Sequence, residues 1–320
     1  MLADNTAPAS TAPPAGVTSV DAAAVPPRRR RPSVVRTVAA AWVLLVVGMA
    51  VLAPVLPLPG YAQGSLAIAR PPSAHHLLGT DQLGRDMLSR VVSGAQTSLL
   101  VGVLSVGLAL VVGVALGLVA GYYGGKADAV VTAVGDVILS VPGLVFLMVI
   151  SALAGSSVRT LVIGIALFTF PTFMRLARAN TMTFARREFV LAAQGLGARD
   201  ARVMRREVLP NVLPSVLAYA FAALGLVLVI EGSLSFLGLG VQPPRPSWGN
   251  MIADGRPFLS SRPHIVLIPA VTLFLTVLAC NALAERGGRP PGAASGAAQG
   301  GERSPGARAA QPGGGAGAAD

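Results

Sequence analysis

The sequence predicts an all-α membrane protein with about six transmembrane helices, and three observations favour this class. Of the 320 residues, 53% are hydrophobic and only 12% are charged, and the mean hydropathy is +0.65. Long uncharged runs alternate with short arginine-bearing segments, which is typical of a chain that crosses a bilayer several times. Most of these runs are close to the ~20 residues that a helix needs to cross ~30 Å of hydrocarbon.

We expect six spans, at about residues 37–58, 98–121, 134–154, 158–176, 212–232 and 264–284. The third run contains Pro142, with Asp136 near its start, so it should form a kinked helix whose freed carbonyl is satisfied by neighbouring helices. In the second run Gly113, Gly117 and Gly121 recur at every fourth position. Such a row lets another helix approach closely, and packing within this chain is the favoured interpretation over a subunit interface.

Both ends of the chain lack the composition of a folded core. Residues 1–33 are rich in Ala, Pro and Thr, and residues 286–320 are dominated by Gly, Ala and Pro. We interpret them as a disordered tail and a low-complexity tail on either side of a transmembrane domain at 34–285. With the N-terminus inside, 18 Lys and Arg residues fall in cytoplasmic segments and 7 in outer segments. Both termini and the loop 177–211 are therefore expected in the cytoplasm, and the net charge of +11 needs no nucleic acid to explain it.

The cytoplasmic loop contains the stretch "FVLAAQGLGARDARVMRREVLPN", residues 189–211, which reads as two short helices. The first has an apolar stripe at i, i+3, i+4 and i+7, formed by Phe189, Ala192, Ala193 and Leu196. Gly197 is expected to end this helix in a left-handed conformation, Asp200 to cap the second helix and Pro210 to end it. A basic, soluble-looking helix pair between two apolar runs suggests a docking element for another protein.

The sequence contains no set of residues with the spacing of a nucleotide, metal or catalytic site. It has no Gly-rich phosphate loop, so we expect no nucleotide site in this chain. Its histidines, His75, His76 and His264, lack metal-ligand spacing, and the single Cys280 excludes an intramolecular disulfide. We expect no catalytic residue, no cofactor and no metal.

Three separated motifs resemble one family. "HHLLGTDQLGRDMLSR", residues 75–90, precedes the second span, and "EGSLSFLGLGVQPPRPSWGNMIADGR", residues 231–256, follows the fifth. The loop between them carries Leu191-Ala192-Ala193, then Gly197, then Val208-Leu209-Pro210. Over about residues 35–285 the chain resembles the permease subunit of a binding-protein-dependent ABC importer, in the dipeptide, oligopeptide and nickel branch.

The resemblance implies a type I ABC importer permease fold in the inner membrane. It implies a second, homologous permease subunit, two cytoplasmic ATP-binding subunits that hydrolyse ATP, and an extracytoplasmic solute-binding protein. The residues that match the docking helix of the family are Glu188, Phe189, Ala192, Ala193, Leu196 and Gly197. Leu191 replaces the glutamate of the family motif, and the sixth span ends in "NALAERGGRPPG" where the family usually continues with a Gly-Asp step.

Several residues outside the docking helix allow more than one interpretation. Glu231, at the outer end of the fifth span, could line the translocation path and meet a peptide amino terminus; the favoured alternative is a hydrated or arginine-paired position at the interface. Asp81 and Arg85 are spaced for a local ion pair. Interface anchors are expected at Trp248 and Tyr61. His75 and His76 are expected to be exposed loop residues.

Two other classes of protein fit less well. A stand-alone secondary transporter would show inverted repeats and broken helices with charged sites at the bilayer midplane. An intramembrane enzyme would need a nucleophile with a base, or a metal cluster, at membrane depth. Neither pattern is clear in this sequence. The sequence also does not determine the solute, which could be a dipeptide, an oligopeptide, nickel or another small solute.

Overall fold

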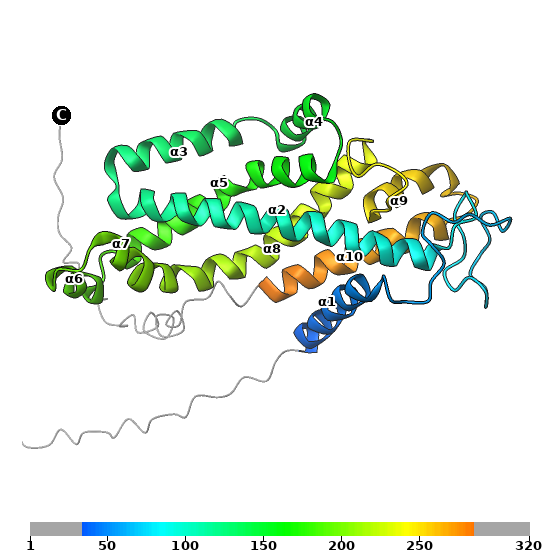
Figure 1. The fold of residues 1–320 in the computed structure, drawn as a ribbon, viewed down its shortest axis with the longest axis horizontal. Helices are drawn as coiled ribbons and strands as arrows, with labels where there is room; N and C mark the ends of the chain where they lie inside the picture. The colour runs from blue at the N-terminus through cyan, green and yellow to red at the C-terminus, as the bar shows by residue number, and fades with distance from the viewer. Residues whose placement is uncertain (1–33, 285–320) are drawn as a thin grey trace, which may run out of the picture. The chain divides into compact units, whose positions relative to one another are not determined.

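The computed structural model describes residues 34–284, and these are helical apart from their connecting segments (Figure 1). The expected tails at 1–33 and 286–320 lie outside the described residues. The α-helices are α1 (Val34–Leu52), α2 (Met87–Tyr123), α3 (Gly125–Leu139), α4 (Gly143–Ala154), α5 (Val158–Phe184), α6 (Glu188–Gly195), α7 (Asp200–Val203), α8 (Leu209–Phe236), α9 (Trp248–Gly255) and α10 (His264–Ala284). A π-helical turn, Met204–Val208, joins α7 to α8, and a 3₁₀ turn, Arg256–Phe258, follows α9.

Five helical segments are long and apolar enough to cross a membrane: α1, α2, α5, the continuous segment Asp200–Phe236 and α10. The pair α3 and α4 makes a sixth if it counts as one span. The multispanning all-α class is therefore confirmed. We expected the third span to be one kinked helix. The structure instead has two separate helices there, α3 and α4, at 84° to each other. Pro142 stands at the break and disfavours helical geometry at Val141, which precedes it.

Two helices extend beyond the apolar runs from which we predicted them. The helix that contains the expected span 98–121 begins at Met87, where the Asp86 side chain accepts a hydrogen bond from the Ser89 amide. At 37 residues α2 is about 55 Å long, well beyond the hydrocarbon thickness. The expectation that Pro210 ends the second loop helix is wrong, since the helix runs on from α7 into α8. The π turn before Pro210 widens the helix where the proline ring would otherwise meet the preceding turn.

Helices α2 and α5 form the most extensive contact in the described chain and run side by side (Figure 1). The glycine row of α2 lies at this contact. A Cβ at Gly117 would be 2.5 Å from the Met174 carbonyl oxygen and 2.7 Å from the Ala177 Cβ. Cβ atoms at Gly113 and Gly121 would meet α5 equally closely. The prediction that the row packs within one chain is confirmed.

We predict that Gly117→Ala destabilises the fold, because the added methyl group requires α2 and α5 to separate. Overpacking of this kind costs about 1–3 kcal/mol. Gly107→Ala is the matched control on the same helix, since a Cβ there meets no atom within 4 Å. The thermal midpoint of the purified chain in detergent should fall for Gly117→Ala and not for Gly107→Ala. Equal midpoints for the two variants would contradict this account of the α2–α5 contact.

Candidate functional site

The short helix α6 turns one face toward the bundle and the other outward. Val190 is fully buried, and Ala193, one turn later, packs partly against the same core cluster. On the outward side Phe189 is 42% exposed, Leu191 55% and Leu196 89%. Of the expected stripe, Phe189, Ala192 and Leu196 are exposed, whereas Ala193 packs partly against the chain itself, and the docking role of the stripe stays a prediction. Apolar residues occur all round this helix, so spacing alone does not show which of them the chain buries.

The turn after α6 is built as the sequence predicts. Gly197 has φ +81°, in the left-handed region that favours glycine. The Ala198 amide donates to the Ala193 carbonyl at 3.1 Å, and the Gly197 amide donates to the Gln194 carbonyl at 2.9 Å. These bonds satisfy carbonyl groups that the helix end leaves free and fix the direction in which the chain leaves α6.

Asp200 does not cap α7, contrary to expectation. It is the first residue of that helix, and no side-chain cap bond is present. Its Oδ1 instead accepts a hydrogen bond from the Tyr122 hydroxyl at 3.0 Å. Gln194 of α6 donates to the same hydroxyl at 2.9 Å. The last turn of α2 therefore contacts both arms of the loop, and nothing in the sequence pattern marked Tyr122 for this position.

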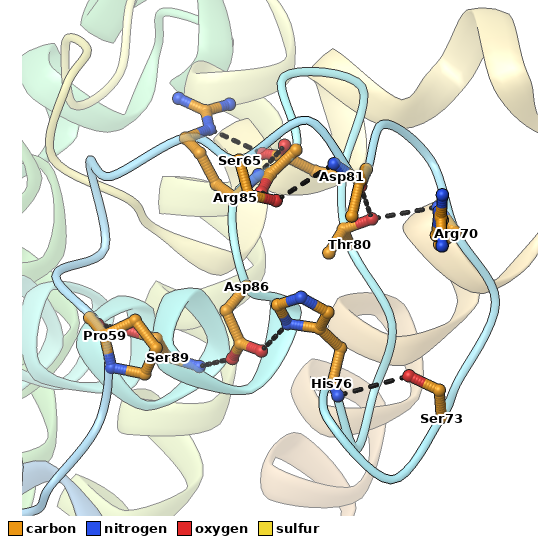
Figure 2. Close-up of polar contacts among 12 residues, drawn as sticks. Pro59, Ser65, Arg70, Ser73, His76, Thr80, Asp81, Arg85, Asp86 and Ser89 are labelled. Carbon is orange, nitrogen blue, oxygen red and sulfur yellow. Dashed lines mark hydrogen bonds and ion pairs between the residues drawn. The ribbon is translucent and has the colours of Figure 1, made fainter.

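The opposite end of α2 carries a folded polar loop (Figure 2). The expected ion pair between Asp81 and Arg85 is confirmed, with Arg85 Nε 2.6 Å from Asp81 Oδ2. The geometry is a tight turn, in which Asp81 Oδ1 accepts from the Leu83 and Arg85 amides. Gly84 allows this turn, with φ +71°. Arg90, from the first turn of α2, places its Nε 3.3 Å from Asp81 Oδ2.

His75 is exposed as expected, but His76 is not a free loop residue. Its Nδ1 lies 2.9 Å from Asp86 Oδ2, and the other oxygen of Asp86 accepts from the Ser89 amide at the start of α2 (Figure 2). His76 thereby fixes the carboxylate that caps the helix. The motif before the second span therefore builds the entry to α2.

Asp254, at the end of α9, joins this cluster. Its Oδ2 lies 3.9 Å from Arg90 Nη2. Partial burial raises the pKa of the Asp254 carboxyl, the guanidinium groups of Arg90 and Arg85 oppose that shift, and Asp81 adds to it. The cluster thus links the segment before α2 to the segment after α8, two motifs that are far apart in the sequence.

The segment 231–256 packs a carboxylate into the protein interior. Glu231 is fully buried, which contradicts the favoured expectation of a hydrated or arginine-paired position. Its Oε2 accepts from Ser98 of α2 at 3.2 Å, and its Oε1 accepts from Ser235, one turn along α8, at 2.7 Å. The Trp248 amide donates in turn to the Ser98 hydroxyl at 3.2 Å. A buried carboxylate therefore joins α2, α8 and the start of α9.

Trp248 is also placed differently from our expectation of an interface anchor. It is fully buried, and its Nε1 donates to the Val91 carbonyl of α2 at 3.1 Å. Tyr61 is half-buried and lines an open cavity of about 320 Å³, so an anchoring role for it stays a prediction. Next to Trp248, a Cβ at Gly249 would lie 2.6 Å from the Gly232 Cα. The motif thus holds α9 directly against α8 and α2.

The described residues supply no site for metal chemistry: residues 34–284 contain no group of three or more His, Cys, Asp and Glu side chains that could hold an ion. The carboxylates and histidines considered above lie in hydrogen-bonded contacts between segments. What the arrangement provides is a bundle of apolar helices with a polar folded cap at one end of α2 and an outward-facing apolar helix at the other (Figure 1).

Fold and site together define a multispanning membrane protein with a short helix whose apolar side chains are partly exposed. A family model described as "Binding-protein-dependent transport system inner membrane component" matches residues 113–287. The chain belongs to this family, and it is a multi-pass protein of the inner membrane and a permease subunit of an ABC importer. The alternative of a stand-alone secondary transporter is set aside.

Relatives agree with this assignment. The glutathione transport system permease protein GsiD of Pectobacterium atrosepticum is 38% identical over 214 residues, which are 67% of this chain and 71% of that protein. The dipeptide transport system permease protein DppC of Alkalihalophilus pseudofirmus is 37% identical over 238 residues, or 74% and 78% of the two chains. A solved chain of the inward-facing MetNI methionine ABC transporter shares the fold, with a TM-score of 0.50 at 16% identity over 63% of this chain and 98% of that one.

We predict that Glu231 acts through its hydrogen bonds and not through contact with a solute. Glu231→Gln keeps one oxygen that accepts from one serine, and its NH2 group can donate to the other serine hydroxyl, which is free to rotate. Membrane abundance and uptake should therefore stay near those of the unmodified protein. Glu231→Leu leaves both buried hydroxyls without the carboxylate, which costs about 1–3 kcal/mol for a buried polar group. Its thermal midpoint in detergent should fall. Normal abundance with strongly reduced uptake in Glu231→Gln would instead place Glu231 on the translocation path.

Proposed function

We propose that this chain forms half of the translocation pathway of a peptide importer, together with a second, homologous permease subunit. An extracytoplasmic solute-binding protein would deliver the solute, and two cytoplasmic ATP-binding subunits would supply the energy. Two relatives, a glutathione and a dipeptide transport system permease, support small peptides as the solute class. The chain itself hydrolyses nothing in this scheme.

The observation that carries the proposal is the outward face of α6. Phe189 and Leu191, which flank the buried Val190, are partly exposed, and Leu196, at the C-cap of the helix, is 89% exposed. Burying a leucine side chain contributes about 1.5–3 kcal/mol, so a partner that covers this face would gain several kcal/mol. Such a face, rimmed by arginines such as Arg187 and Arg199, suits a protein surface with an apolar cleft and an acidic rim.

The replacement of the family's motif glutamate by Leu191 fits this surface. Leu191 is 55% exposed, so the position that the family motif gives to a glutamate is here apolar. Glu188 is exposed at the first turn of α6, where a carboxylate is favourable near a helix N-terminus. We infer that docking in this chain depends more on apolar contact than it does in relatives that keep the glutamate.

The distribution of charge supports the proposed orientation of the chain in the membrane. The bias of 18 Lys and Arg to 7 supports a cytoplasmic α5–α8 connection, and with it a cytoplasmic α6. Both termini then lie in the cytoplasm. The loop between α1 and α2, with its folded polar cap, lies outside, where a solute-binding protein would approach.

We predict that Leu196→Glu uncouples the chain from its ATP-binding subunit without harming the fold. Leu196 is 89% exposed, so a carboxylate there is solvated in the free chain but would be buried unpaired after docking. Membrane abundance should be normal, whereas co-purification of the ATP-binding subunit and solute uptake should fall at least tenfold, the equivalent of about 1.4 kcal/mol.

The control is Arg202→Gln, an exposed position on α7 in the same loop. It removes a charge without touching the face of α6, so it should retain most of the uptake and co-purification. Full uptake and full co-purification in Leu196→Glu would show that α6 is not the docking helix.

A further inference from the structure

The Tyr122 hydroxyl is the polar contact that links α2 to both arms of the α6–α7 loop. It accepts from Gln194 Nε2 at 2.9 Å and donates to Asp200 Oδ1 at 3.0 Å. Gln194 lies at the end of α6 and Asp200 begins the helix that continues into α8. The hydroxyl therefore closes a bridge across the Gly197 turn.

The three side chains lie where water reaches them, since the Gln194 and Asp200 contacts are at the protein surface. Exposed hydrogen bonds exchange readily with water and add little net stability. Their effect here is on direction, because two bonds from one rigid ring join the end of α2 directly to both sides of the Gly197 turn, in addition to the packing of Val190. Tyr122 stands in the last turn of α2, the helix that packs along α5.

We propose that Tyr122 is a positioning residue that passes movement of the docked helix α6 to α2. This role rests on the proposed function of α6. When an ATP-binding subunit displaces α6, the bridge moves the end of α2 with it, and the close α2–α5 contact carries the displacement into the bundle. Without the hydroxyl, α6 still presents its apolar residues and docks, but the direct link from the loop to the end of α2 is lost and less of the movement reaches α2.

Tyr122→Phe tests this role, and Tyr123→Phe is the matched control. Tyr123 is the next residue on α2, is 55% exposed, and stands in edge contact with Tyr122 at 5.2 Å between ring centroids. Its hydroxyl makes no hydrogen bond with another residue of 34–284. Each substitution thus removes one hydroxyl from neighbouring rings, and only one of them breaks the bridge.

The measurement is made on the complete transporter in membranes, with ATP hydrolysis recorded with and without the loaded solute-binding protein. For Tyr122→Phe we expect normal abundance, normal co-purification of the ATP-binding subunit and normal basal hydrolysis, with a several-fold loss of stimulation and of uptake. Tyr123→Phe should behave as the unmodified protein. Asp200→Ala should resemble Tyr122→Phe, and Asp200→Asn, which keeps an oxygen acceptor, should restore most of the stimulation.

The results distinguish a failure of the positioning role of Tyr122 from a failure of the proposed function of α6. Equal stimulation in Tyr122→Phe and Tyr123→Phe overturns the positioning role and leaves the docking helix intact. Loss of co-purification in Tyr122→Phe also overturns it, because the residue would then act in docking. If the unmodified chain binds no ATP-binding subunit, the proposed function itself fails, and the positioning role fails with it.

Discussion

The close approach of α2 and α5 is the contact on which the other features of this permease depend. At Gly113, Gly117 and Gly121 the two backbones are too near for any side chain. Apolar side chains gain little from leaving lipid for another helix, so membrane helices associate through such packing and through polar contacts. α2, with 37 residues, is longer than the hydrocarbon thickness of a bilayer. The α2–α5 pair is therefore a stiff axis between the loop that precedes α2 and the α6 segment.

Polar contacts join α2 and α5 to their neighbouring helices and fix how these helices are aligned along their length. On α5, Arg178 pairs with Asp128 of α3, its Nη2 lying 2.6 Å from Asp128 Oδ2, and Arg175 pairs with Asp136 of the same helix. On the other side of α2, Ser98 donates to the buried Glu231 of α8. The Ser98–Glu231 contact is fully buried, so leaving either group unpaired there would cost about 1–3 kcal/mol. The Arg175–Asp136 pair is half exposed, so it adds little stability and mainly favours one arrangement of α3 against α5.

The sequence predicted those features that depend on local chemistry. Apolar runs located the spans, the glycine row located a helix contact, and Gly197 located the turn after α6, because hydrophobicity and backbone freedom act within a few residues. It failed where the outcome depends on distant partners. The Glu231 carboxylate is enclosed by a serine 133 positions away, and Trp248 is buried against α2. Tyr122 lay at the end of an apolar run with no pattern to connect it to Asp200.

The sequence also did not show which side of α6 faces the bundle. Phe189, Val190 and Leu191 are consecutive apolar residues, and only the fold shows that Val190 is the one that the chain buries. The sharp break between α3 and α4 was underestimated for a similar reason. A proline predicts an interruption, but the 84° angle depends on where α5 and the other helices leave room.

The most direct test of the account is a photo-cross-link from the outward face of α6. A photoreactive amino acid is placed at Leu196 and, as the control, at Leu66, which is fully exposed in the loop between α1 and α2. In membranes that contain the whole transporter, the probe at Leu196 should cross-link to the ATP-binding subunit, and the probe at Leu66 should not. A cross-link to that subunit from Leu66 and none from Leu196 would contradict both the orientation and the docking role of α6.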